Sequence, residues 1–98
     1  MKHEYHNVLL TEVAWEVCNQ IGGIYTVLRS KAPAMVNEWG DNYCAVGPYF
    51  RDKADVELEH ATDYNDDFGQ AVVKMQQRGF DIVYGTWLIS GRPKVVLI

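Results

Sequence analysis

The fold of this chain is decided by one stretch, Glu12-Val13-Ala14-Trp15-Glu16-Val17-Cys18-Asn19-Gln20-Ile21-Gly22-Gly23-Ile24-Tyr25-Thr26-Val27-Leu28. An apolar run that starts at Val8 leads into the pair Gly22-Gly23, and a pattern of helical period begins immediately afterwards. Glycines between a strand and a helix let the backbone adopt dihedral angles closed to other residues and approach a ligand closely. The free N–H groups and the positive dipole end of the helix point to the same place, which suits a diphosphate. The alternative is that the glycines only let the helix pack on the sheet.

The composition is that of one small globular domain. The chain has 98 residues, of which 48% are hydrophobic and 22% are charged, and this length is short for an α/β enzyme with a cleft of its own. The net charge of −4 argues against nucleic acid and anionic membranes as partners, because both favour basic patches. No signal peptide is visible, and no segment approaches the roughly 20 apolar residues of a membrane span.

Cys18 and Cys44 are the only cysteines, and they form no metal-ligand spacing with each other or with the histidines. We therefore expect two reduced, largely buried thiols of a cytoplasmic protein, and no metal site.

The first half of the chain reads as a strand, a helix and a second strand. Residues Val8 to Ala14 predict a strand buried on both faces, because the run is largely apolar. The helix after Gly22-Gly23 contains Pro33, which removes a backbone donor and predicts a kink or a break into two short helices. Residues Tyr43 to Gly47 predict the next strand. Such a unit joins parallel strands by a right-handed crossover.

The second half predicts an edge strand, a helix and two more strands. Asp55 to Glu59 alternates polar and apolar residues, which suits an edge strand, with an extended loop as the alternative. Residues 63–67 offer helix N-caps, and Gly79 ends the helix that follows. The apolar face of this helix consists of Phe68, Ala71, Val72 and Met75. Phe80 to Leu88 predicts a buried strand, and the turn Gly91-Arg92-Pro93 leads into a last strand.

That last strand, Lys94 to Ile98, is apolar and stops at the final residue. A strand at a free chain end would expose an adhesive edge. We therefore expect these residues to be the opening of a longer protein.

Seven short motifs follow one another along the chain. They are Glu12 to Val17, Gly22 to Leu28, Ser30 to Ala32, Glu38 to Tyr43, Val46 to Tyr49, Val83 to Ile89, and Pro93 to Leu97. In this order and spacing they resemble the N-terminal part of the glycogen synthases of animals, fungi and some bacteria, over most of the chain. The resemblance implies an α/β fold, a Rossmann-like parallel sheet with covering helices. Residues 1–98 would be a partial N-terminal domain of a two-domain GT-B glycosyltransferase.

The resemblance also implies an activity. Members of this family transfer glucose from UDP-glucose to the non-reducing end of an α-1,4-glucan such as glycogen, with retention of configuration and without a metal ion or other cofactor. It implies a full-length protein that is a homo-oligomer and binds neither nucleic acid nor membranes. The catalytic residues would lie outside this fragment, so the fragment alone should be inactive. The alternatives are a stand-alone nucleotide- or phosphate-binding α/β module without catalysis, and an inactive remnant.

Three residues are donor-site candidates by this resemblance: Gln20, Gly22 and Gly23 would bind the UDP part of the donor. Position 20 is normally Lys or Arg in the family and contacts the diphosphate, whereas Gln20 is neutral. Either another basic residue compensates, or catalytic competence is reduced, or this subfamily always differs here. Thr86 stands where the family usually has Arg, and we expect it to be surface variation.

Two further pairs of residues have structural interpretations in place of functional ones. Glu12 and Glu16 could suggest the paired carboxylates of a glycoside hydrolase, but no recognisable set of sugar-binding aromatic residues accompanies them. Trp15 and Trp87 are expected to pack in the fold and not to serve as sugar platforms.

Overall fold

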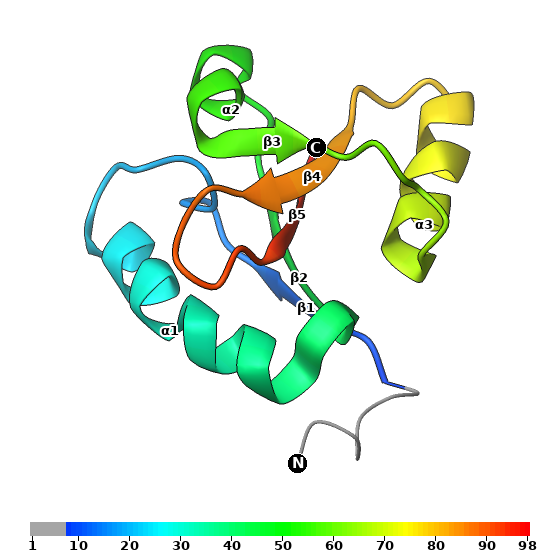
Figure 1. Ribbon diagram of the computed structural model, residues 1–98. Helices are drawn as coiled ribbons and strands as arrows, with labels where there is room; N and C mark the ends of the chain where they lie inside the picture. Colours follow the sequence, from blue (N-terminus) through cyan, green and yellow to red (C-terminus); the bar gives the residue numbers. More distant parts are fainter. Residues whose placement is uncertain (1–7) are drawn as a thin grey trace.

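The computed structural model describes residues 8–98 as one five-stranded sheet with helices packed against it (Figure 1). In chain order the elements are β1 (Leu10–Val13), α1 (Gly23–Trp39), the short 3-10 helix η2 (Gly40–Asn42), β2 (Tyr43–Gly47), α2 (Arg51–Glu57), β3 (Leu58–His60), α3 (Asp67–Gln77), β4 (Val83–Trp87) and β5 (Lys94–Leu97).

The strand order across the sheet is β1-β2-β5-β4-β3. Strands β1, β2 and β5 run parallel, with Leu10 opposite Tyr43 and Cys44 opposite Lys94. This confirms the predicted α/β fold and the parallel pairing of the two strands that α1 connects. The sheet is mixed, however, because β4 lies antiparallel to β5 and β3 lies antiparallel to β4.

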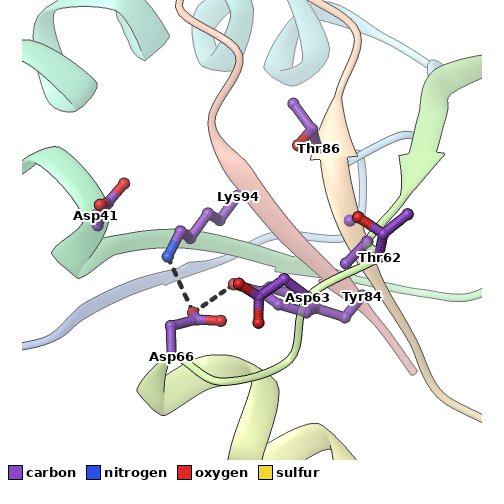
Figure 2. Close-up of a pocket in the computed structure, with 9 residues that line it drawn as sticks. Asp41, Thr62, Asp63, Asp66, Tyr84, Thr86 and Lys94 are labelled. Atoms are coloured by element: carbon purple, nitrogen blue, oxygen red, sulfur yellow. Dashed lines mark hydrogen bonds and ion pairs between the residues drawn. The ribbon is translucent and has the colours of Figure 1, made fainter.

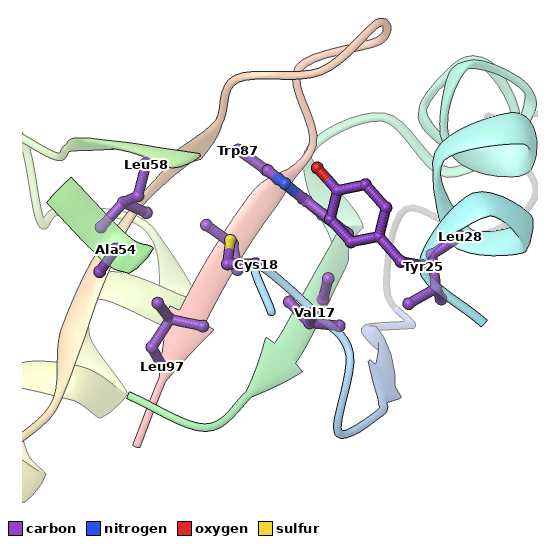
Figure 3. Close-up of a cluster of buried hydrophobic side chains, with 10 residues drawn as sticks. Val17, Cys18, Tyr25, Leu28, Ala54, Leu58, Trp87 and Leu97 are labelled. Carbon is purple, nitrogen blue, oxygen red and sulfur yellow. The ribbon is translucent and has the colours of Figure 1, made fainter. Parts of the chain in front are cut away.

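Alternation along the central strand β5 divides the interior into two cores. Val95 and Leu97 belong to one core and Val96 to the other, as expected for side chains that point alternately to opposite faces. The first core packs α1 and α2 against the sheet, and Figure 3 shows Tyr25 of α1 beside Trp87 of β4. The second core packs α3 against the other face, through Phe68 and Val72 among others. Helices therefore cover both faces, as the resemblance implied.

Strand β1 corrects one expectation. The predicted strand is present over Leu10–Val13, but it lies at an edge of the sheet and is not buried on both faces. Val13 is 74% exposed, and β1 has a neighbouring strand on one side only. The last strand, β5, lies between β2 and β4, so the premise that it would expose an adhesive edge is wrong.

Helix α1 continues through Pro33 without breaking into two short helices. Tyr25, Leu28 and Ala32 are buried along it, and this packing outweighs the one backbone hydrogen bond that proline removes. The β4–β5 turn also packs here. A Cβ atom on Gly91, whose φ is +87°, would lie 2.8 Å from the Pro33 Cα atom.

Residues 55–57 are helical, so the predicted edge strand is wrong over its first half. The alternation was misleading because Val56 is 75% exposed. The buried positions here are Ala54 and Leu58, whose four-residue spacing is that of a helix face. The edge strand that does form is β3, which begins at Leu58.

Helix α3 and the two last strands lie close to their predicted positions. Phe68 and Val72 are buried, whereas Ala71 is exposed, so the apolar face is narrower than predicted. Gly79 follows the helix with a φ of +91°, as expected for a residue that ends a helix. Strand β4 is shorter than predicted, and Phe80 remains exposed before it.

Candidate functional site

The segment between β1 and α1 reverses direction at the carboxyl end of β1. Backbone bonds from Val17 to the Ala14 carbonyl (3.3 Å) and from Asn19 to the Glu16 carbonyl (3.2 Å) form the turn. Cys18 adopts a left-handed conformation within it, with a φ of 54°. Gln20 then leads along the surface into α1. Ligands of open α/β sheets bind outside the carboxyl ends of the strands, so this loop is in the right place for a site.

Neither Gly22 nor Gly23 has a positive φ, so the expectation of backbone dihedrals closed to other residues is wrong here. Gly22 is extended, with φ −148° and ψ −150°, and Gly23 begins the helix. A Cβ atom on Gly23 would meet nothing within 4 Å. Close packing of helix on sheet does not explain Gly23 either. Because Gly22 and Gly23 have no side chains, the space beside the first turn of α1 is open.

The Glu16 carboxylate caps this helix. Its Oε1 atom accepts hydrogen bonds from the backbone N–H of Gly22 (2.8 Å) and of Tyr25 (3.1 Å). These bonds, led by the one from Gly22, hold the pKa of Glu16 below its usual value. Sequence reasoning missed this role, because a capping side chain normally stands at the N-cap or three residues later. Glu16 instead lies in the loop, 6 residues before the N-cap residue Gly22.

Two N–H groups of the first helical turn have no partner in the described part of the chain. Among residues 8–98, no acceptor is found for the backbone N–H of Gly23 or of Ile24. Both residues are exposed. An anion at this end of α1 would therefore meet two unpaired donors and the positive end of the dipole.

Glu12 has a different environment from Glu16. It forms an ion pair with Lys31 of α1 and accepts a hydrogen bond from the Tyr43 hydroxyl at 2.7 Å. These contacts tie β1 to α1 and β2. Since each carboxylate has its own structural partners, the arrangement does not favour a glycosidase pair.

The two tryptophans differ in burial. Trp87 is 1% exposed and packs in the first core, as expected. Trp15 does not pack in either core of residues 8–98, contrary to expectation: it is 64% exposed, and its ring meets the Phe50 ring edge to face, with 5.7 Å between the centroids.

Gln20 lines a cavity of about 250 Å³ between the loop and α2. The other lining residues are Cys18, Asp52, Lys53, Val56 and Glu57. Gly22 and Gly23 do not line it; they lie on the exposed start of α1. The structure thus places Gln20 and Gly22 in the loop and Gly23 at the start of α1, with Gln20 beside the cavity that α2 lines.

Two polar side chains, the buried Asn19 and the half-buried Glu57, fix the walls of this cavity. Asn19 is 0% exposed; its Oδ1 accepts a hydrogen bond from Lys53 Nζ, and its Nδ2 donates to the Trp15 carbonyl at 2.9 Å. Glu57 Oε1 accepts hydrogen bonds from the Tyr25 hydroxyl (2.8 Å) and from Trp87 Nε1 (3.0 Å). These bonds connect the loop, α1, α2 and β4 around one site.

Thr86 lies on the opposite face of the sheet, in a cavity of about 410 Å³. Figure 2 shows the polar centre of this cavity, where Asp66 accepts hydrogen bonds from the Tyr84 hydroxyl (2.5 Å) and from Lys94 Nζ (2.9 Å). Thr86 takes no part in these bonds. Because its side chain lies on the α3 face, it is remote from the loop that holds Gln20.

Cys18 and Cys44 are free and buried, as predicted. Burial raises the pKa of the Cys44 thiol to about 12 and also raises that of Cys18. Neither thiol is a nucleophile at neutral pH. Residues 8–98 contain no group of three or more His, Cys, Asp or Glu side chains arranged to hold a metal ion. In the same range, no helix is both long and apolar enough to cross a membrane.

Comparison with known proteins shows to which family the chain belongs. The model of the glycogen synthase family matches residues 12–98. The chain belongs to the glycogen synthase family. It is 47% identical over 90 residues to the liver glycogen (starch) synthase of Homo sapiens, 46% over 94 residues to the enzyme of Neurospora crassa, and 41% over 106 residues to isoform 1 of Saccharomyces cerevisiae.

These alignments include 92%, 96% and 99% of this chain, respectively. They cover 13%, 13% and 15% of the three relatives. The chain therefore spans about an eighth of the length of the glycogen synthases it matches. Membership confirms the resemblance seen in the sequence motifs. The roles of Gln20, Gly22 and Gly23 remain predictions.

Proposed function

We propose that the protein carrying this chain is a glycogen synthase that transfers glucose from UDP-glucose to the non-reducing end of an α-1,4-glucan, with retention of configuration. The observation that supports this is the family match over residues 12–98, together with relatives named glycogen synthase. Residues 1–98 form part of the N-terminal Rossmann-like domain of a GT-B enzyme. The whole enzyme is a cytoplasmic homo-oligomer that needs no metal ion.

In this proposal the start of α1 is one wall of the donor site. The unpaired N–H groups of Gly23 and Ile24 bind a phosphate oxygen, and the open flank of Gly23 gives the ligand room to approach. Gln20 donates a neutral hydrogen bond from its amide. Donors that are already in place where negative charge develops on the leaving UDP stabilise the transition state, because they need no reorganisation.

Glu16 restricts where the diphosphate can bind. Its carboxylate already accepts from Gly22 and Tyr25, so the phosphate binds beside it, on the Gly23 and Ile24 side of the turn. The capping bonds hold the loop in one conformation before the ligand arrives. Such preorganisation lowers the entropy lost on binding.

The proposal is tested with the full-length protein, glycogen and UDP-glucose labelled in the glucose. We expect label to enter the α-1,4-linked chains of glycogen. β-Amylase, which cleaves these chains from their non-reducing ends, should then release the label. The isolated 98 residues should release UDP at the background rate, since a GT-B site holds its reactants between two domains. A folded full-length protein that incorporates no label would contradict the proposal.

A further inference from the structure

A diphosphate at the start of α1 needs positive charge, and the loop itself supplies none. Residues 14–23 contain no Lys or Arg, and Gln20 is neutral. The one basic side chain that lines the cavity beside Gln20 is Lys53, from α2. The chain brings this lysine to the loop through tertiary packing.

Lys53 is held in place by a neutral partner. Its ammonium donates to Oδ1 of the fully buried Asn19, the residue directly before Gln20. The Lys53 Nζ atom also lies 5.9 Å from the centre of the Phe50 ring, within the range of a cation–π contact. Neither contact neutralises its charge. An ammonium has three donors, so the Asn19 bond leaves two for a ligand.

Among the described residues, no acidic side chain pairs directly with this ammonium, although Asp52 and Glu57 line the same cavity. Glu57 is occupied by the Tyr25 hydroxyl and the Trp87 indole N–H. Asp52 is exposed in the first turn of α2. A positioned lysine bound to an amide, and open to a cavity, is arranged to meet an anion.

We propose that Lys53 binds the diphosphate of the nucleotide-sugar donor and supplies the positive charge that the loop before α1 lacks. This inference rests on the proposed function and names a further binding residue for it. Asn19 is the positioning residue, because it holds the ammonium next to Gln20 without neutralising it.

The test moves the charge from one side of the cavity to the other. In the full-length protein, UDP is titrated into the wild type, Lys53→Gln, Lys53→Arg, and the double variant Gln20→Lys/Lys53→Gln. Lys74→Gln, on the exposed side of α3, removes the same charge from the far face. Loss of one charged hydrogen bond should weaken UDP binding by about tenfold in Lys53→Gln. The double variant should recover most of this loss, and Lys53→Arg and Lys74→Gln should bind within about twofold of wild type.

Salt separates a charge effect from a structural one. The difference between wild type and Lys53→Gln should shrink as ionic strength rises, because salt screens the interaction. Wild-type affinity in Lys53→Gln would overturn the proposal. So would a loss that Gln20→Lys fails to restore, since that would show that Lys53 only supports Asn19. Melting temperatures of all variants identify any that do not fold, and Lys53→Arg then still tests the need for charge.

Inorganic pyrophosphate, titrated into the same set, distinguishes failure of this inference from failure of the proposed function. If UDP does not bind to the wild type but pyrophosphate binds and depends on Lys53, the donor assignment is wrong and the anion site stands. If neither probe binds to any variant, the inference is overturned together with the donor assignment.

Discussion

The two faces of the sheet handle their charges differently. On the α3 face, Asp66 accepts hydrogen bonds from both Tyr84 and Lys94, so its charge is met within the fold. On the α1 and α2 face, the Lys53 ammonium is held by the neutral Asn19. The N–H groups of Gly23 and Ile24 have no acceptor among residues 8–98. The Asp66 charge on the first face is met without a ligand, whereas the second face has donors left over among residues 8–98. In the proposed function, these unpaired donors, which the fold holds in position, mark the binding face.

Two glycines differ in the space around them, and the more crowded one, Gly85, should give the largest effect. A Cβ atom on Gly85 of β4 would lie 2.1 Å from the Glu59 carbonyl oxygen, which is backbone and cannot move aside cheaply. Gly85→Ala should therefore lower the free energy of unfolding by about 3 kcal/mol or more. Urea denaturation of the full-length protein measures this. An unchanged denaturation midpoint would show that β3 and β4 are not packed this closely.

Gly23→Val should have the opposite balance of effects: a large loss of UDP affinity and a small loss of stability. No atom lies within 4 Å of a Cβ at this position, and the residue is helical, so valine fits the empty protein. Its branched side chain would fill the space over the free N–H groups, and UDP affinity should fall by more than about tenfold. UDP titration and melting temperature together check this, with Gly23→Ala as the smaller control. Affinity that falls only in step with folded fraction would make Gly23 structural.

Asp66→Asn should affect stability alone. The change weakens two charge-assisted hydrogen bonds and should cost about 1–2 kcal/mol of unfolding free energy, with UDP affinity unchanged. Partial burial raises the pKa of Asp66, but the bonds from Tyr84 and Lys94 outweigh it, and the net pKa lies below the usual 3.8. Because the pKa is lowered by folding, this contribution is present above that value and is lost as pH falls through the lower, folded pKa.

Comparing wild type with Asp66→Asn across acid pH checks this sign. The two stability curves should converge as the pH drops below about 4. Curves that stay parallel would mean that the Asp66 charge does not stabilise the α3 face.

Gln20→Lys should give the smallest effect, a gain in UDP affinity of up to about tenfold. A second cation beside the cavity would strengthen the attraction for a diphosphate, although desolvation of the ammonium and repulsion from Lys53 reduce the gain. Isothermal titration at low and high salt measures it, and the gain should shrink in high salt. A loss of affinity would show that residue 20 points away from the donor.

Much of the fold could be predicted from local patterns. The strand before Gly22, the helix after it and the strand at Tyr43 follow from hydrophobic period and turn residues, and their parallel pairing follows from the connection. Residues 55–57 could not be predicted correctly, because the alternation around Val56 does not reflect burial. The position of β5 between β2 and β4 depends on long-range pairing, which no local pattern encodes.

The candidate site could also be predicted only where local sequence patterns define it. The motif around Gly22 and Gly23 locates the loop, but it does not show that the space above Gly23 is open while the φ angles are ordinary. Glu16 caps the helix from a position outside the usual capping pattern. Lys53 reaches the loop only because α2 packs against it. Both roles require the folded chain.

A structure of the full-length protein with UDP bound tests the central claim most directly. A phosphate oxygen should lie within hydrogen-bond distance, about 3.2 Å or less, of the backbone N–H of Gly23 or Ile24. Glu16 should still cap Gly22 and Tyr25, and the Lys53 ammonium should be turned toward the diphosphate. A UDP molecule whose diphosphate binds away from the start of α1, with these N–H groups still unpaired, would contradict the account.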